Sequence, residues 1–180
     1  MAAEEVLEKI LIGNLTRVND WLRFAETKNA ALLTFSSAWL VAICSLLSNE
    51  RVPTLIKISL SFAFPFLLGG ALIAVASLLP KFQKKDHGET AQQLTTKNLL
   101  FHGNICKLDI ATANNAFSTR YRIAANGDFS PSHITDLSTQ LVETSRVAER
   151  KFKFFTAGVY ALVLAFFTAI LTAAFQYVVG

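Results

Sequence analysis

The chain has 180 residues, of which 52% are hydrophobic and 17% are charged, and its formal net charge is +4. A soluble domain of this length can bury a core without collecting its apolar residues into long blocks. Here, however, three long runs contain no charged residue. This grouping weighs against a soluble domain with a large helical core and favours an integral membrane protein.

Residues 1–29 precede the first apolar run and predict an amphipathic helix. Their apolar residues recur every three or four positions, which places them on one face. The segment is acidic on balance, so this stripe suits packing on another cytoplasmic helix better than binding to anionic lipid. No proline or glycine interrupts residues 14–47, so we expect the helix to continue into the membrane. The stripe consists of Leu7, Leu11, Leu15, Val18, Leu22 and Ala25.

The first charge-free run, 30–48, has 19 residues, close to the roughly 20 that cross about 30 Å of hydrocarbon. It predicts the first transmembrane helix. The polar link at 49–57 contains Pro53, predicts a turn, and is expected outside the cell.

The second run, 58–80, has 23 residues and predicts the second transmembrane helix. Pro65 removes a backbone hydrogen bond and predicts a kink, with a gating hinge as the sharper alternative. Gly69 and Gly70 permit the close approach of another helix. These three residues are candidates for coupling a signal to the membrane.

The polar stretch 83–97 has no periodicity and predicts a mobile loop. A helix is predicted at 104–125. Another is predicted to start with Ser130 as its cap and Pro131 at its first position. This last helix has no breaker before its apolar end, so we expect it to run into a third transmembrane helix at 154–178.

The basic residues give the orientation. Of 17 Lys and Arg residues, four lie in 1–29, two in 49–57 and eleven in 81–153. The positive-inside rule places the N-terminus and 81–153 in the cytoplasm, and the C-terminus outside. The expected fold class is therefore all-α, with three transmembrane helices and a cytoplasmic helical bundle formed by extensions of the spans.

Catalytic motifs are absent from the sequence. It contains no Gly-rich phosphate loop, HExxH, CxxC or GxSxG. Asp86–His87 reverses the His-Asp metal pair, and no second histidine follows at ligand spacing. We therefore expect no catalytic residue, metal or cofactor, and a nucleotide hydrolase is the remotest interpretation.

Two stretches have groups suited to an anionic ligand. His102 and Asn104 lie at a predicted helix start, where backbone N–H groups favour an anion. Arg146 and Lys151 lie on the helix just before the third span. The alternative for each cation is an interface anchor or a solvated helix face.

Glu26 and Lys28 mark the cytoplasmic membrane surface on the first helix. If they meet the helix that carries Arg146 and Lys151, they form a charged collar at the junction with the spans. They are therefore candidate coupling residues, and Lys28 is also a candidate for a phosphate group.

Four different short sequence elements follow one another along residues 15–175. They are Glu26-Thr27-Lys28-Asn29-Ala30-Ala31-Leu32-Leu33, then Leu79-Pro80-Lys81, then Phe101-His102-Gly103-Asn104-Ile105, and finally Asp136-Leu137 with Ser145, Ala148 and Lys151 at intervals of three. This ordered set resembles the transmembrane effectors of Pycsar, the bacterial antiphage systems built on a pyrimidine nucleotide cyclase. Pro65 matches no feature of that set.

The resemblance implies an antiphage effector of the bacterial inner membrane. Such a protein senses a cyclic pyrimidine mononucleotide, cCMP or cUMP, and impairs the membrane so that the infected cell stops supporting phage. Three spans cannot enclose a wide pore alone, so we expect a homo-oligomer in contact with the lipid bilayer, and no nucleic-acid partner. The alternative is a constitutive structural or partner-docking membrane protein without a nucleotide ligand.

Overall fold

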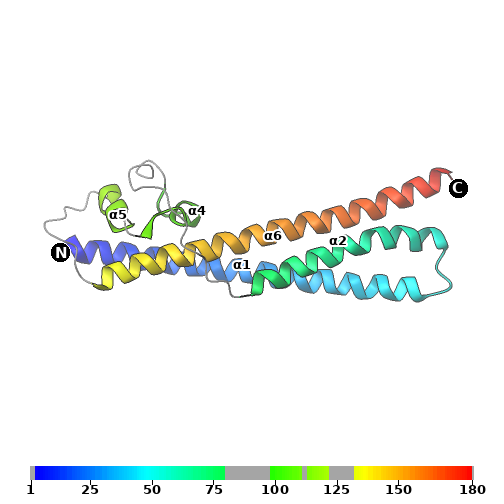
Figure 1. Ribbon diagram of the computed structural model, residues 1–180, viewed down its shortest axis with the longest axis horizontal. Coiled ribbons are helices and arrows are strands. Elements are labelled where there is room, and N and C mark those ends of the chain that lie inside the picture. Colours follow the sequence, from blue (N-terminus) through cyan, green and yellow to red (C-terminus); the bar gives the residue numbers. More distant parts are fainter. Residues whose placement is uncertain (1–2, 80–97, 111–112, 122–131, 180) are drawn as a thin grey trace. The chain divides into compact units, whose positions relative to one another are not determined.

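The computed structural model describes residues 3–79, 98–110, 113–121 and 132–179 (Figure 1). The loop expected at 83–97 lies outside these residues. The described part is helical and confirms the expected all-α class. Its helices are α1 (Ala3–Ser48), α2 (Thr54–Leu78), α4 (His102–Ile105), α5 (Ala113–Tyr121) and α6 (Ser132–Val179).

The chain forms two compact units. Unit 1 contains residues 1–24 and 81–150, and unit 2 contains residues 25–80 and 151–180. The long helices α1 and α6 each contribute residues to both units. This continuity confirms that neither helix is interrupted before its apolar part. The expected start of the last helix at Ser130 and Pro131 lies outside the described residues.

Unit 1 has an apolar core built on the stripe of α1. Leu7 and Leu11 are fully buried, and they share one cluster with Phe117 of α5 and with Ile134 and Leu141 of α6. The stripe therefore packs on protein, as its acidic surroundings predicted. Leu15 packs at the edge of this cluster. Burying large aliphatic and aromatic side chains stabilises a unit of this kind through the hydrophobic effect.

The prediction of one continuous helix at 104–125 is wrong. The chain instead forms the single turn α4, which ends at Ile105, and α5 begins only at Ala113. Leu108, which lies between these two helices in the sequence, has a fully buried side chain. The carbonyls of Cys106 and Leu108 accept hydrogen bonds from a side chain of α6. These tertiary contacts override the local helical pattern.

Unit 2 contains the three apolar helices, which lie side by side (Figure 1). Each is long and apolar enough to cross a membrane. The second helix begins at Thr54, four residues before the expected span, and the amides of Ile56 and Lys57 donate to the carbonyl of Pro53. The interior cluster is small and consists of Ile43, Ala63, Leu67 and Ala165.

Candidate functional site

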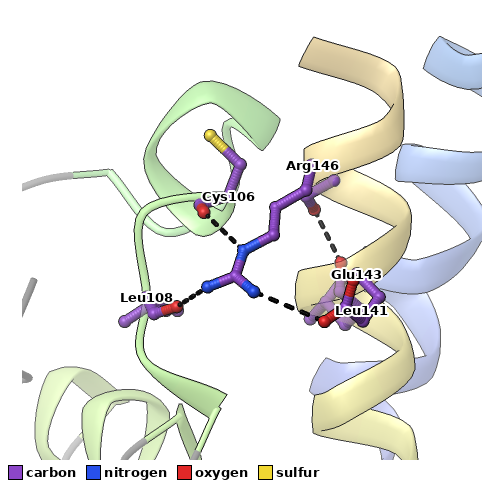
Figure 2. A network of polar contacts seen from close by, with 6 residues as sticks. Cys106, Leu108, Leu141, Glu143 and Arg146 are labelled. Atoms are coloured by element: carbon purple, nitrogen blue, oxygen red, sulfur yellow. Dashed lines mark hydrogen bonds and ion pairs between the residues drawn. The ribbon is translucent and has the colours of Figure 1, made fainter. Parts of the chain in front are cut away.

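Arg146 of α6 holds the turn that follows α4 (Figure 2). Its Nε donates to the carbonyl of Cys106 at 3.1 Å, and its Nη2 donates to the carbonyl of Leu108 at 3.0 Å. Its Nη1 pairs with Oε1 of Glu143 at 3.3 Å. A planar guanidinium presents five donors in a fixed geometry, which suits several oxygen acceptors at once. Arg146 therefore fixes the end of α4 against α6.

His102 is the first residue of α4 and is only 5% exposed. Its ring centroid lies 4.6 Å from that of Phe101 and 5.6 Å from that of Trp21. Its Nε2 lies 3.4 Å from Oε2 of Glu149. Burial lowers the pKa of His102, and the charge of Glu149 opposes that shift only in part. The imidazole is therefore neutral at neutral pH, when Nε2–H can donate to the carboxylate.

Asn104 connects α4 to the residues that precede it. Its Nδ2 donates to the carbonyl of Asn98 at 2.9 Å. The Oδ1 of Asn98 in turn accepts the amide of Leu100 at 2.9 Å. Three of the predicted ligand residues, His102, Asn104 and Arg146, thus gather at α4 in unit 1.

The other two, Lys28 and Lys151, belong to unit 2. Lys151 is 8% exposed, and its Nζ lies 2.8 Å from Oε1 of Glu26. The Nζ of Lys28 lies 5.1 Å from the ring centroid of Phe155, within cation–π distance. Glu26 and both lysines therefore take part in contacts between α1 and α6.

Asn29 completes this polar group within unit 2. It is fully buried, and its Nδ2 donates both to the carbonyl of Ala25 at 2.9 Å and to the carbonyl of Lys151 at 3.1 Å. A side-chain amide that bridges two helix backbones fixes their register. Asn29 was missed as a candidate, although its position at the edge of an apolar run was a usable signal.

The three coupling candidates of α2 have different surroundings. Pro65 is exposed, and α2 continues through it as one helix. A Cβ atom on Gly69 would have no neighbour within 4 Å, whereas one on Gly70 would lie 3.5 Å from the carbonyl oxygen of Gly158. Of the two glycines, Gly70 is therefore the one at a close helix contact. Gly158, its partner in α6, was not among the candidates from the sequence.

Trp21 and Glu149 are the other residues that sequence reasoning missed. Both surround His102, but they lie 81 residues before it and 47 residues after it. No local pattern links residues so far apart. Their proximity depends on the packing of α1, α4 and α6 in unit 1.

Comparison of the chain with known proteins identifies its family. A family model described as the Pycsar effector protein domain matches residues 10–178. The chain belongs to the Pycsar effector family. A Pycsar effector protein from a Rhizobium species, RsPycTM, is 33% identical over 155 residues, which cover 86% of this chain and 87% of the relative. No solved structure matches the chain.

The Pycsar effector match covers most of both units and all three spans. It confirms the resemblance that the ordered sequence elements indicated. The chain is thus a membrane protein and an effector of antiphage defence.

Proposed function

We propose that this Pycsar effector senses cCMP or cUMP through unit 1 and impairs the bacterial inner membrane through unit 2, which causes abortive infection. Membership of the family is the observation that carries the proposal. The structure adds a physical route, because α1 and α6 each supply residues to both units. A ligand that prefers one arrangement of these helices in unit 1 shifts their population by its differential affinity. No catalytic step is involved.

The orientation follows from the charges. Fifteen of the 17 basic residues fall in 1–29 and 81–153, so the positive-inside rule places both segments in the cytoplasm. The C-terminus then lies outside the inner membrane. Unit 1 would thus meet a nucleotide made in the cytoplasm.

The ligand contacts are proposed for the surroundings of α4. The exposed face of Trp21 beside His102 offers a stacking surface for a pyrimidine, and Asn104 offers an amide to its edge. Arg146 uses three of its five N–H donors for oxygen atoms of the described residues, and we propose that another of its donors binds a phosphate oxygen. Lys28 and Lys151 are second choices for the phosphate. Their contacts within unit 2 favour a role in the response of the spans.

A homo-oligomer is proposed because three helices enclose no wide pore. The open space beside Gly69 leaves room for a helix of a second copy. The spans also present large apolar side chains outward, among them Leu72, Phe167 and Ile170. Lipid or a neighbouring copy can cover this surface.

Calorimetric titration of the purified protein with cCMP, cUMP and cAMP tests the ligand. We expect heat of binding with at least one pyrimidine nucleotide and none with cAMP. His102→Ala and Asn104→Ala should weaken binding, whereas Lys9→Ala, which changes an exposed residue of α1, should not. No heat of binding with any of the three nucleotides would overturn the proposal that the protein senses cCMP or cUMP.

Dye entry into cells that express the protein with its cyclase tests the membrane separately. We expect entry only when the cyclase is active. A constitutive structural or partner-docking protein would cause neither toxicity nor dye entry.

A further inference from the structure

Three polar side chains are fully buried inside unit 2, among the helices that can cross the membrane. Asn29 and Ser36 of α1 and Ser77 of α2 are each 0% exposed. The Oδ1 of Asn29 and the Oγ atoms of Ser36 and Ser77 have no hydrogen-bond partner among the described residues. A buried polar atom without a partner loses its hydrogen bonds to water and gains none in the protein. These three unpaired oxygen atoms therefore reduce the stability of the packed arrangement of unit 2, although the Nδ2 of Asn29 makes two hydrogen bonds there.

The spans satisfy other hydroxyl groups with their own backbone. The exposed Thr34 donates to the carbonyl of Ala30 at 3.0 Å, and the exposed Ser61 donates to the carbonyl of Lys57 at 2.8 Å. Bonds of this type keep a Ser or Thr of a membrane helix paired. Ser36 and Ser77 lack such bonds.

The three side chains lie at two levels of the interior. Asn29 and Ser36 are seven residues apart, so they share a face of α1 about 10.5 Å apart along its axis. Ser36 Oγ lies 3.8 Å from the position that a Cβ atom of Gly70 would take. α2 is antiparallel to α1 (Figure 1), and Ser77 follows Gly70 by seven residues. Ser77 therefore lies two turns from Gly70, toward the same end as Asn29. We call Asn29, Ser36 and Ser77 the polar seam.

The backbone adds oxygen atoms to this seam. The carbonyl oxygen of Gly158 lies 3.5 Å from the same Cβ position on Gly70. Glycine at both positions lets the helices approach closely and brings this oxygen next to α2. Neutral amide, hydroxyl and carbonyl oxygens are the groups that bind water and replace the hydration shell of a monovalent cation.

We propose that the polar seam is a binding site for water and small monovalent cations, and that it lines the route by which they cross the membrane when the effector acts. This inference rests on the proposed membrane impairment and names the residues that carry it. Water supplies the missing partners of the three polar atoms when the helices separate. The seam thus lowers the free energy of the hydrated arrangement relative to the packed one. A smaller difference in ligand affinity between the two arrangements is then enough to shift their populations.

Cysteine accessibility tests the seam directly. Cys44→Ser and Cys106→Ser remove the two native thiols, and Ser36→Cys then introduces one on the seam. The matched control is Ser37→Cys, which is the next residue and lies on the exposed face. Each protein is reconstituted into phosphatidylethanolamine–phosphatidylglycerol vesicles and treated with a cationic, water-soluble methanethiosulfonate. The thiolate of the cysteine, which forms in water, attacks the sulfenyl sulfur of the reagent, so that a disulfide forms and methanesulfinate leaves.

We expect cCMP or cUMP to raise the modification rate of Ser36→Cys by at least about tenfold and to leave that of Ser37→Cys unchanged. Potassium efflux from the same vesicles reports the leak. Efflux without modification of Ser36→Cys, or equal modification with and without nucleotide, would overturn the inference alone. If the chain with native serines shows no efflux with either nucleotide, the proposed function fails and the inference fails with it.

A second pair of variants keeps the test valid if the cysteine protein folds poorly. Ser36→Ala with Ser77→Ala removes two seam hydroxyls and changes little volume. Ser37→Ala with Ser61→Ala removes two exposed ones. We expect the seam pair to reduce nucleotide-dependent efflux several-fold and the exposed pair to leave it intact. Equal efflux from both pairs would contradict the role of the seam.

Discussion

The two units of this effector bury different proportions of large apolar side chains. Unit 1 encloses large apolar residues such as Leu11 and Phe117. Unit 2 encloses mainly small and polar residues such as Gly70 and Ser36 beside a few large ones such as Leu67, and the side chain of Leu72 is exposed. In water, apolar burial drives assembly. Between membrane helices that drive is absent, because lipid is as apolar as leucine, so close packing and polar contacts must hold the helices together.

The helix α1 shows this difference within one continuous element. In unit 1 its buried face carries one polar residue, Asn14, among apolar ones such as Leu7 and Leu11, whereas in unit 2 Asn29 and Ser36 alternate with apolar residues such as Leu32 and Ile43. The spacing of buried residues stays helical throughout, while the share of polar residues among them rises in unit 2. The size and polarity of a buried side chain should therefore affect stability differently in the two units, and substitutions in each unit can test this.

The largest effect is expected for Arg146→Ala in unit 1. It removes the donors to the carbonyls of Cys106 and Leu108. We expect a loss of about 3 kcal/mol in the free energy of unfolding, because the removed bonds are charge-assisted and leave acceptors unpaired. Hydrogen exchange should show faster exchange of the amides of α4 and of the turn after it.

Arg146→Lys sharpens this test. Lysine keeps the charge but cannot reach two carbonyls with a planar fork, so we expect it to recover little stability. Lys9→Ala should change stability by less than about 0.5 kcal/mol. Full recovery with lysine would show that charge, not geometry, makes Arg146 important in unit 1.

The next effect is expected for Gly70→Leu in unit 2. A larger side chain at this position meets the carbonyl of Gly158 and the side chains of Ala161 and Ser36. Overpacking should cost about 2 kcal/mol. The thermal midpoint in detergent should fall, although the change adds apolar surface.

Gly69→Leu is the matched control, since a Cβ atom there meets nothing within 4 Å. We expect its thermal midpoint, measured on the monomer in detergent, to stay close to that of the parent. If Gly70→Leu were as stable as Gly69→Leu, small residues would not hold the spans of unit 2 together, and the comparison between the units would fail.

The sequence predicts the features that local pattern determines. Charge-free length predicts the three spans, and the spacing of Leu7, Leu11 and Val18 predicts the buried face of α1. The break between α4 and α5 was not predictable, because it depends on Arg146, which lies 40 residues after Cys106.

The candidate site divides in the same way. Residue type identified His102, Asn104 and Arg146, and the structure brings them together at α4. Their neighbours Trp21 and Glu149 depend on the register of α1 against α6, which no local pattern contains.

A smaller effect is expected at the ion pair of unit 2. Glu26→Gln removes the partner of Lys151, whose side chain is 10% exposed, whereas that of Glu26 is 48% exposed. Because one partner is solvated, we expect a loss of only about 1 kcal/mol. A double-mutant cycle with Lys151→Gln measures the coupling by thermal unfolding. Zero coupling would leave Asn29 and close packing as the contacts that join α1 and α6 in unit 2.

The smallest effect is expected from pH, and it concerns unit 1. Burial lowers the pKa of His102 below the 6.5 of a solvated imidazole. The unfolded chain then binds a proton at a higher pH than the folded one. Stability is therefore complete above pH 6.5 and falls as the pH drops from there toward the folded pKa.

His102→Gln should remove this dependence, whereas His133→Gln, which changes an exposed histidine, should keep it. Unfolding followed between pH 7.5 and 5.5 measures the difference. A stability that rises on acidification would mean that Glu149 outweighs burial at His102. The core of unit 1 would then hold a charged pair and resemble the polar interior of unit 2.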